Sequence, residues 1–320
     1  MDCSQGRVQA LWGAAVTFGE TPWVDKNYRA LHEALQRRVP AEWLPRMISE
    51  RTVHSTVGFD PPRPFTEVIK FKKPVIEEYG CGHYGCVAPT HEPGLVFKLT
   101  TDASEAAFVA RAMTLPETAG IVEYKKIYST GLKHRGKPLF VLWRTEATAV
   151  GAWSFTARHP DVYGKQVQRE ADNLLRTFLA WAKIVREYVY PKLRSLQTQY
   201  ADRPDELVAE RTKLLAELWK SYEREESAHD SEVDVDYMRG IRRVGIALRT
   251  CLYVSQEMQG NAALYRVGQA LGHYLEEGIL LADVHGNNIG IDDGEAIITD
   301  PGHAVEFHPK WAPAPQIERL

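Results

Sequence analysis

Apolar residues follow different spacings in different parts of the chain, and each spacing predicts a different kind of structure. From Phe65 to about Glu146, short apolar runs alternate with turn residues, which is typical of β-strands. The expected strands cover residues 67–70, 75–79, 94–99, 121–128 and 139–143. One helix is expected among them, over residues 103–113, with Asp102 as its N-cap. This segment therefore predicts a small antiparallel sheet that carries a single helix.

From residue 161 to about 277, apolar residues recur every three or four positions, which predicts helices. One apolar stripe ends near Val189, and Pro191 is expected to kink or end that helix. Further helices are expected near Pro204, after Asp236 and over residues 262–277, where Gly278 stops the last one. The chain then returns to short strands at 289–291 and 296–299, joined by a turn at 292–295.

Residues 1–65 mix short helical pieces, one of them over 27–38, with breaks marked by proline. The segment 59–64 holds three prolines and is expected to be an extended connector. The pattern therefore predicts an α+β protein in three parts. These are a helical extension at 1–65, a β-rich lobe at 66–150, and a mostly helical lobe at 151–320 with an inserted helical block at about 161–258.

Composition excludes several classes of protein. A net charge of -3 gives no reason to expect nucleic acid or an anionic membrane as a partner. No apolar run reaches the roughly 18 residues that a membrane-spanning helix needs. The first residues lack the features of a secretory signal, and four cysteines are too few for a disulfide scaffold. These features predict a cytoplasmic protein with reduced thiols.

A glycine-rich segment, Gly80-Cys81-Gly82-His83-Tyr84-Gly85-Cys86-Val87, follows the strand expected at 75–79. Glycines at this spacing let the backbone approach phosphate closely and expose N–H donors to it. A dinucleotide-binding fold needs a helix to open at the third glycine, but Pro89, Pro93 and Gly94 forbid one here. The segment therefore favours a hairpin that covers nucleotide phosphates, and an ordinary glycine-rich turn is the alternative.

Lys98 lies inside an apolar strand, Val96-Phe97-Lys98-Leu99. A lysine in that position is costly unless its ammonium meets anions. Nucleotide phosphates and the carboxylate of Glu105, in the helix that follows, would supply them. The macrodipole of that helix also explains an acidic residue in its first turn.

The segment Leu281-Ala282-Asp283-Val284-His285-Gly286-Asn287-Asn288 places an asparagine five residues after an aspartate, between a helix and a strand. Asp283 can orient an attacking hydroxyl group and accept its proton, and Asn288 offers an amide oxygen to a magnesium ion. Asp300 ends a short strand 12 residues beyond Asn288 and is expected to be the main magnesium ligand.

With these residues the chain resembles the protein-kinase-like superfamily, most closely the early Ser/Thr protein kinases of lytic tailed bacteriophages. The matching motifs are Gly80-Cys81-Gly82-His83-Tyr84, Lys98, Asp283-Val284-His285-Gly286-Asn287-Asn288 and Ile298-Thr299-Asp300-Pro301. The catalytic-loop motif is also similar to that of aminoglycoside and choline phosphotransferases. The resemblance covers about residues 75–115 and 262–303.

The resemblance implies a bilobal kinase-like fold that holds ATP and Mg²⁺ between a β-rich lobe and a truncated helical lobe, with the connection near Arg144-Thr145-Glu146. It implies that Asp283, Lys98 and His285 are catalytic and that Asn288 and Asp300 bind the metal. The residues expected to bind the nucleotide are Gly80, Gly82, His83, Tyr84, Gly85, Val87, Lys98, Glu105, Trp143 and Thr145. The expected partner is a protein substrate, either a host protein or the chain itself.

The sequence departs from the family pattern in ways that leave alternatives open. Leu281-Ala282 replaces the usual His-Arg, and Asp300-Pro301-Gly302 replaces Asp-Phe-Gly. His285 stands where Ser/Thr kinases have a lysine that contacts the transferred phosphoryl group, so it either serves as that donor or only braces the loop. Few residues follow Gly302, so the helical block is expected to form the substrate platform, or the substrate is not a conventional peptide.

Two other classes of function remain open besides a Ser/Thr protein kinase. They are a small-molecule phosphotransferase and a nucleotide-binding pseudokinase that serves as an interaction module. A rival site, formed by Cys81, His83, Cys86 and His91, could bind zinc, although this spacing fits no common zinc motif.

Overall fold

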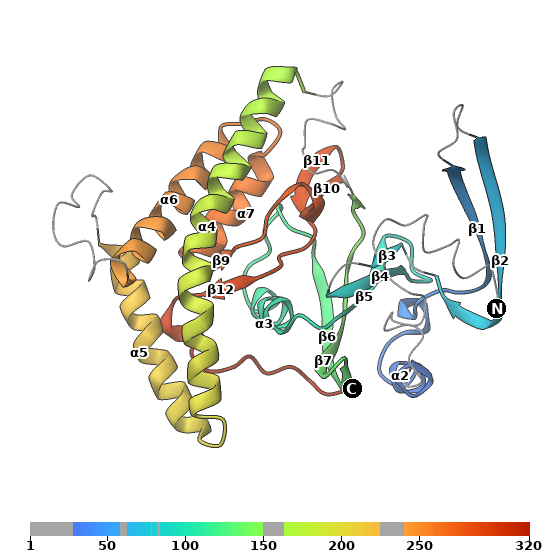
Figure 1. The fold of residues 1–320 in the computed structure, drawn as a ribbon, viewed down its shortest axis with the longest axis horizontal. Helices are drawn as coiled ribbons and strands as arrows, with labels where there is room; N and C mark the ends of the chain where they lie inside the picture. Colours follow the sequence, from blue (N-terminus) through green and yellow to red (C-terminus); the bar gives the residue numbers. More distant parts are fainter. Residues whose placement is uncertain (1–27, 58–62, 78, 82–83, 150–162, 225–239) are drawn as a thin grey trace. The chain divides into compact units, whose positions relative to one another are not determined.

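The computed structural model describes residues 28–57, 63–77, 79–81, 84–149, 163–224 and 240–320 (Figure 1). The chain divides into two compact units, each built from separate segments. Unit 1 consists of residues 1–101, 125–145 and 317–320, and unit 2 consists of residues 102–124 and 146–316. The first part of the chain is thus rich in strands and the second in helices, which confirms the predicted α+β class.

Unit 1 is built on a five-stranded sheet with the strand order β3-β4-β5-β7-β6. Its strands are β3 (Gly80–Cys81), β4 (Gly85–Pro89), β5 (Leu95–Thr100), β6 (Tyr124–His134) and β7 (Lys137–Thr145). Arg135 and Gly136 connect β6 to β7, and both have positive φ angles, 49° and 78°. Such a two-residue connection matches the twist of the flanking strands and fixes their register.

One face of this sheet carries the core of unit 1. Helix α2 (Tyr28–Leu35) contributes Leu31 and Leu35 to that core, and the short 3-10 helix η2 (Ala41–Trp43) lies beside it. Trp143 is fully buried there, with its ring 5.4 Å from that of Phe97 and its Nε1 donating a hydrogen bond of 2.8 Å to the Trp43 carbonyl. Burial of these large side chains is the main source of stability for the unit.

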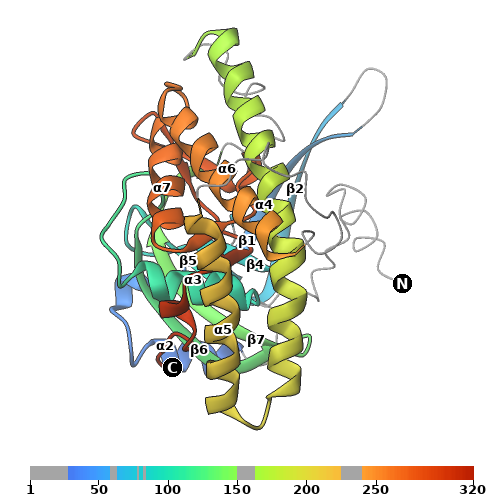
Figure 2. The ribbon, with the colours of Figure 1, turned by 90° about the vertical axis from the view of Figure 1, so that its left-hand side faces the viewer.

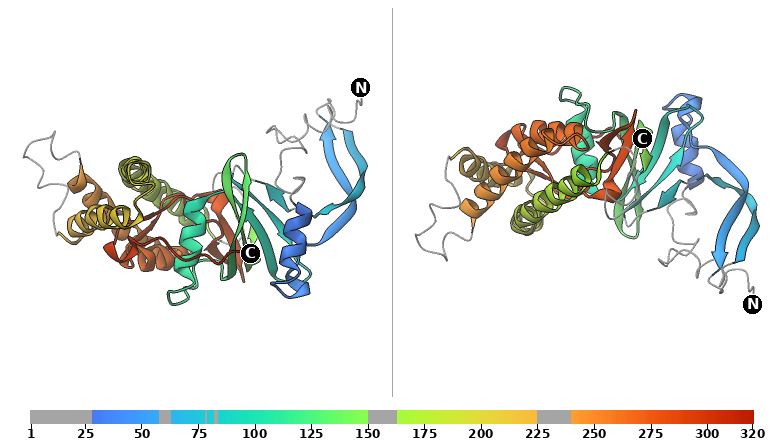
Figure 3. Two further views of the ribbon diagram at one scale, coloured as in Figure 1. Left: turned by 90° about the horizontal axis from the view of Figure 1, so that it is seen from below. Right: turned by 90° about the horizontal axis from the view of Figure 1, so that it is seen from above.

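A long antiparallel hairpin of β1 (Met47–Val57) and β2 (Arg63–Ile76) forms a separate two-stranded sheet. It extends away from the rest of unit 1 (Figure 3). The prediction of helical pieces throughout residues 1–65 is therefore wrong for β1, and the predicted boundary at residue 65 falls inside β2. The sequence of β1 does not alternate regularly between apolar and polar residues, because Ser49, Glu50, Arg51 and Thr52 follow one another directly.

The structure also corrects the predicted state of two cysteines. Cys81 and Cys86 stand directly opposite each other in the β3–β4 ladder, and they form a disulfide bond. The prediction of free thiols at these positions is therefore wrong, and the paired sulfurs are not available as zinc ligands. Cys251 is a free, buried cysteine, and burial raises the pKa of its thiol.

Unit 2 contains α3 (Ala103–Ala112) and four longer helices that pack against one another (Figure 2). These are α4 (Lys165–Gln199), α5 (Pro204–Glu223), α6 (Ile241–Gln259) and α7 (Tyr265–Glu276). Helix α6 contacts α4, α5 and α7. Helix α4 continues past Pro191 to Gln199, so proline does not end it. None of the described helices combines the length and hydrophobicity needed to cross a membrane.

The helices predicted for this part of the chain begin close to where the sequence places them. The Asp102 carboxylate accepts a hydrogen bond of 2.8 Å from the Ser104 backbone N–H, which confirms the predicted N-cap of α3. Pro204 occupies the first turn of α5, where its missing N–H costs no hydrogen bond. Gly278 follows α7 with a φ of 80°, a conformation that favours glycine.

Short strands in unit 2 form two small sheets. One has the order β11-β10-β8, with β8 (Thr148–Ala149), β10 (Ile289–Asp292) and β11 (Glu295–Ile298). The other pairs β9 (Ile279–Leu281) with β12 (Ala304–Glu306). The 3-10 helices η6 (Gly286–Asn288) and η7 (Pro309–Trp311) complete the unit.

A buried ion-pair network connects β12 to two helices. Glu306 is 8% exposed and forms ion pairs with Arg111 of α3, at 3.1 Å, and with Arg211 of α5. Burial lowers the pKa of the Arg211 guanidinium, against the opposing effect of Glu306. Because two guanidiniums share one carboxylate, loss of Glu306 would leave buried positive charge without compensation.

Candidate active site

The β10–β11 hairpin brings the two predicted metal ligands together. Ile289 pairs with Ile298, so Asn288, just before β10, lies opposite the residues just after β11. The Asn288 carbonyl accepts hydrogen bonds from the backbone N–H groups of Thr299, at 2.8 Å, and Asp300, at 3.4 Å. Asn288 and Asp300, which are 12 residues apart in sequence, are thus in direct backbone contact in the fold.

A second ladder brings Asp283 to the same place. Leu281 pairs with Ala304, and continuing this register by two residues sets Asp283 opposite Gly302. A Cβ atom added to Gly302 would lie 3.4 Å from Asp283 Oδ2 and 3.6 Å from Asp300 Oδ1. Both carboxylates therefore approach one glycine, which leaves open the space that a side chain would occupy. The structure brings together Asp283, Asn288 and Asp300 within unit 2.

Hydrogen bonds inside the loop fix the orientation of Asn288. Its Nδ2 donates to the Asp283 carbonyl at 2.6 Å and lies 3.4 Å from His285 Nε2. With the amide nitrogen engaged in this way, the amide oxygen is the atom left for a cation. The Asp300 carboxylate accepts a hydrogen bond of 3.2 Å from the Gly302 backbone N–H. The two side chains together present the oxygen ligands that magnesium prefers.

The arrangement fits a metal that is shared with a substrate. Within the described ranges, no group of three or more His, Cys, Asp and Glu side chains is placed to hold a metal ion. Asn288 and Asp300 supply one amide oxygen and one carboxylate. Mg²⁺ commonly takes one or two such protein ligands and completes its shell with water and substrate phosphates.

Two nitrogen-bearing side chains flank the Asp283 carboxylate. Arg186 Nη1, from α4, lies 3.8 Å from Asp283 Oδ1, and His285 Nε2 lies 3.9 Å from Oδ2. The three side chains are each about one-third exposed, between 29% and 35%. A carboxylate in this setting keeps access to solvent and to an incoming ligand. Arg186 was not among the predicted site residues, because 97 positions separate it from Asp283 and no local pattern marks it.

The next turn of α4 contributes Tyr190, which packs against the segment that follows Asp300. Its hydroxyl group donates a hydrogen bond of 3.4 Å to the Ala304 carbonyl, and its ring lies 6.1 Å from that of His303. Burial raises the pKa of the Tyr190 phenol, so it remains protonated as a donor. His303 has a φ of 55°, a strained conformation for a residue other than glycine, and such strain is frequent near functional sites.

The predicted nucleotide residues of unit 1 gather around β5. Lys98 is 6% exposed and pairs with Val87 of β4, while Gly85 pairs with Thr100. In an antiparallel ladder, directly paired residues point to the same face of the sheet, so Lys98 and Val87 share one face. Gly85 is required by close packing, because a Cβ there would lie 2.1 Å from the Leu99 carbonyl oxygen.

The rest of the glycine-rich segment is described only in part. Gly80 pairs with Val87, and the Tyr84 carbonyl accepts hydrogen bonds from the Thr101 backbone N–H, at 2.7 Å, and from its hydroxyl group, at 3.0 Å. The ammonium of Lys137 lies 5.0 Å from the centre of the Tyr84 ring. Gly82 and His83 lie outside the described residues. The hairpin predicted from the sequence is thus present as β3 and β4.

Trp143 and Thr145 lie on the other face of this sheet. Trp143 pairs with Phe97, and Thr145 pairs with Leu95, whereas Lys98 pairs with Leu142. The Trp143 side chain therefore belongs to the core of unit 1 and not to the face that carries Lys98. The position of the Trp143 side chain therefore does not support the prediction that this residue binds a cofactor.

Glu105 occupies the first turn of α3 and is 2% exposed. It belongs to unit 2, and Lys98 belongs to unit 1. Their predicted ion pair therefore stays a prediction. A carboxylate buried to this extent needs hydrogen bonds or an opposite charge to offset its lost hydration. This need is consistent with a role for Glu105 as the partner of a cation.

Comparisons with known proteins give only distant similarity. No protein-family model and no curated protein matches the chain. Among solved structures, spectinomycin phosphotransferase in complex with ADP and spectinomycin is 11% identical, with a TM-score of 0.29 over 88% of this chain and 70% of that one. A thermostable mutant of an aminoglycoside phosphotransferase is 12% identical, with a TM-score of 0.26 over 72% of this chain and 68% of that one. A likeness of this size assigns no activity to the chain.

Proposed function

We propose that the chain is an ATP-dependent phosphotransferase that acts on hydroxyl groups of protein serine or threonine. The observation that carries this proposal is the convergence of Asp283, Asn288 and Asp300 through the β10–β11 and β9–β12 ladders. A carboxylate for the acceptor hydroxyl and a pair of metal ligands, held by one small framework, is the combination that phosphoryl transfer requires.

In this proposal each residue has a distinct role. Asp283 orients the acceptor hydroxyl group and receives its proton. Asn288 and Asp300 hold Mg²⁺, which neutralises charge on the nucleotide phosphates. Lys98 and the β3–β4 hairpin, both in unit 1, bind nucleotide phosphates. Catalysis of this kind consists mostly of positioning and charge stabilisation. Substitution of any one of these residues should therefore lower the rate of transfer strongly.

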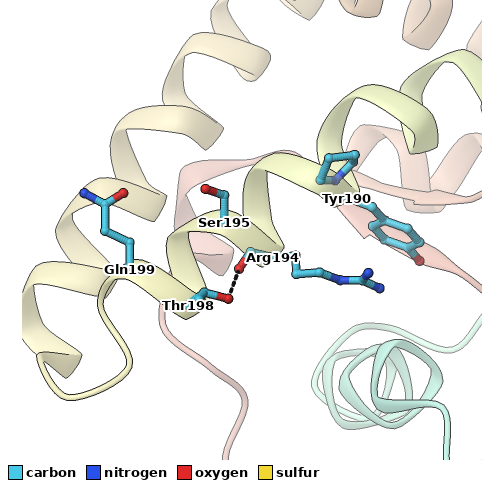
Figure 4. Close-up of a pocket in the computed structure, with 6 residues that line it drawn as sticks. Tyr190, Arg194, Ser195, Thr198 and Gln199 are labelled. Carbon is cyan, nitrogen blue, oxygen red and sulfur yellow. Dashed lines mark hydrogen bonds between the residues drawn. The ribbon is translucent and has the colours of Figure 1, made fainter.

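A second candidate function has one observation in its favour. An open cavity of about 590 Å³ lies along α4 and is lined by Tyr190, Pro191, Arg194, Ser195, Thr198 and Gln199 (Figure 4). Its volume is within the range of small-molecule sites, roughly 300–1,000 Å³. Tyr190 is one helical turn from Arg186, which contacts Asp283. An acceptor that is a small molecule with a hydroxyl group would therefore also suit unit 2.

The test is incubation of the purified chain with γ-labelled ATP, Mg²⁺ and either a cell lysate or its small-molecule fraction. Acid-stable label on serine or threonine of proteins supports the first candidate, and label only in small molecules supports the second. Asp283→Asn and Asp300→Asn should each reduce transfer by about 10³-fold or more. Asp293→Asn is the matched control, because Asp293 is exposed in the β10–β11 turn and asparagine tolerates its positive φ of 49°.

Two results would remove the proposal. Transfer at full rate in Asp283→Asn would show that this carboxylate does not serve the reaction. A thermal shift with ATP, but no transfer to any acceptor with either Mg²⁺ or Mn²⁺, would identify a nucleotide-binding interaction module in place of an enzyme.

A further inference from the structure

The catalytic loop itself offers no fixed positive charge to a transferred phosphoryl group. Residues 281–290 contain neither lysine nor arginine. A phosphoryl group in transfer carries negative charge on its oxygens, and an arginine or lysine beside it contributes strongly to the rate in enzymes of this type. A side-chain cation beside the acceptor would therefore have to come from outside this loop.

His285 is the histidine within the loop, and its ring takes part in the hydrogen bonds of the loop itself. Its Nδ1 accepts a hydrogen bond of 3.2 Å from the Asn287 backbone N–H, and this interaction caps η6. Nδ1 is therefore engaged within the loop. His285 thus stabilises the loop.

Arg186 meets the requirement from α4. Its Nη1 lies 3.8 Å from Asp283 Oδ1, close enough for an ion pair but beyond hydrogen-bonding distance. Across the described ranges of the chain, no atom accepts a hydrogen bond from the Arg186 side chain. The Arg186 side chain is 29% exposed, so it is partly desolvated and still open to an incoming anion.

The position of Arg186 on its helix also indicates where an acceptor would approach. Residues 186, 190 and 194 are four apart and share one face of α4. Tyr190 and Arg194 line the cavity along this face (Figure 4). Arg186, which lies beside the Asp283 carboxylate, therefore shares one helical face with two residues that line the cavity.

We propose that Arg186 is a catalytic residue that binds the phosphoryl group as it moves from ATP to the acceptor. The bond between the γ-phosphorus and the bridging oxygen to the β-phosphate breaks, and a bond to the acceptor oxygen forms. The acceptor proton passes to Asp283, and ADP leaves with the bridging oxygen. The Arg186 guanidinium donates hydrogen bonds to the non-bridging oxygens of the transferred group while it also orients the Asp283 carboxylate.

The inference rests on the proposed function, and its test separates the two. Arg186→Gln should reduce kcat by about 100-fold or more, because one charged donor at the transferred group is lost. KM for ATP and the thermal unfolding temperature should change little. Arg176→Gln is the matched control on the same helix, since the Arg176 side chain bonds only to Asp172 and Asn173 one turn away among the described residues.

Two further measurements exclude a merely structural role. Arg186→Lys keeps the charge but loses the planar pair of donors, so it should recover part of kcat. Guanidinium ion added to Arg186→Ala, well below denaturing concentrations, should increase the rate in a saturable manner, and it should not do so for Arg176→Ala. A residue that only stabilised α4 would show neither effect.

The outcomes are distinct. If the wild-type chain transfers no phosphate, the proposed function is wrong and this inference with it. If the wild-type chain is active and Arg186→Gln keeps its kcat, the proposed function stands and the role of Arg186 is refuted. If Arg186→Gln does not fold, Arg186→Lys decides, because a lower kcat at unchanged KM supports the role and an unchanged kcat overturns it.

Discussion

At the scale of single residues, Gly85 and Gly80 show that two glycines of one motif serve different purposes. A Cβ at Gly85 would lie 2.1 Å from the Leu99 carbonyl oxygen and 3.1 Å from Thr100 Cα, both of them backbone atoms. A Cβ at Gly80 would meet no atom within 4 Å. The close approach of β5 to β4 therefore explains why residue 85 must be glycine. Packing does not explain why residue 80 is glycine.

Gly85→Ala should destabilise the protein by about 2–3 kcal/mol, because the strands must separate to admit the methyl group. Gly80→Ala should change the free energy of unfolding by no more than about 0.5 kcal/mol. Chemical denaturation of the two variants checks both values. Equal losses in the two variants would contradict the packing argument. A loss of ATP affinity in Gly80→Ala at full stability would support its predicted contact with phosphate.

His308 gives unit 2 a dependence of stability on pH. Burial lowers the pKa of its imidazole from the usual 6.5, and Lys310 lowers it further. The ring packs against Trp219, with 4.3 Å between the ring centres, and Nδ1 accepts a hydrogen bond of 2.9 Å from the Lys310 backbone N–H. The folded state therefore binds a proton less readily than the unfolded state, and stability is lost as pH falls below 6.5.

His308→Asn should reduce this loss, because asparagine can still accept the bond from Lys310 but does not titrate. The measurement is the unfolding temperature at pH 7.5 and at pH 5.5 for wild type and variant. The decrease between the two values should be smaller in His308→Asn. His91→Asn, at an exposed position, should leave the decrease unchanged. The same pH response in all three proteins would refute the argument.

At the scale of secondary-structure elements, the Cys81–Cys86 disulfide closes the β3–β4 hairpin. It encloses only a few residues, so the chain-entropy model gives a contribution of about 2 kcal/mol. Dithiothreitol should lower the unfolding temperature of the wild type, and it should have no effect on the double variant Cys81→Ser/Cys86→Ser. Thiol titration of the unfolded chain should find two more thiols after reduction than before. An unchanged thiol number would show that the bond does not form.

The elements that local pattern predicts well are those with strong local signals. The sequence predicts a helix over 103–113, and α3 is found at Ala103–Ala112, because Asp102 caps it and apolar spacing continues through it. The segment from Asp283 to Asp300 was predicted as a loop, a strand, a turn and a strand, and it has these elements. Strand β1 was missed because its polar residues hide the alternation, and β9 and β12 because each is only three residues long.

The candidate site could be predicted only as far as neighbouring residues define it. Asp283, Asn288 and Asp300 lie within 18 residues of one another, and a hairpin signal between them is visible in the sequence. Arg186 and the Cys81–Cys86 bond were not foreseen. The first depends on packing of α4 against a loop far along the chain, and the second on the register of two short strands. Neither leaves a periodic signal.

At the scale of the whole molecule, residues 317–320 belong to unit 1 although the preceding 171 residues, 146–316, belong to unit 2. Glu318 forms ion pairs of 3.1 Å with Arg38 and with Lys126. The backbone of Ser129 bonds to Glu318 and Leu320 at 2.9 Å, and Leu320 packs against the core. This short segment therefore acts as a brace within unit 1.

Removal of residues 317–320 should destabilise unit 1 by about 2 kcal/mol or more, because backbone bonds and apolar burial are lost together. Glu318→Gln is the matched control and should cost less than about 1 kcal/mol, since both ion pairs are exposed. Hydrogen exchange in β6 and α2 reports on unit 1 directly. Unchanged exchange after the removal would contradict the role given to these residues.

This division of the chain has a consequence for biosynthesis. The ribosome produces all of unit 2 before residues 317–320, so unit 1 lacks one of its segments until unit 2 has been made. Domains generally fold as units, beginning with the residues that emerge first, but unit 1 cannot complete its contacts in that order. In a nascent chain the β-rich unit would therefore stay incompletely folded, and in need of chaperones, while the whole of the helical unit is being made.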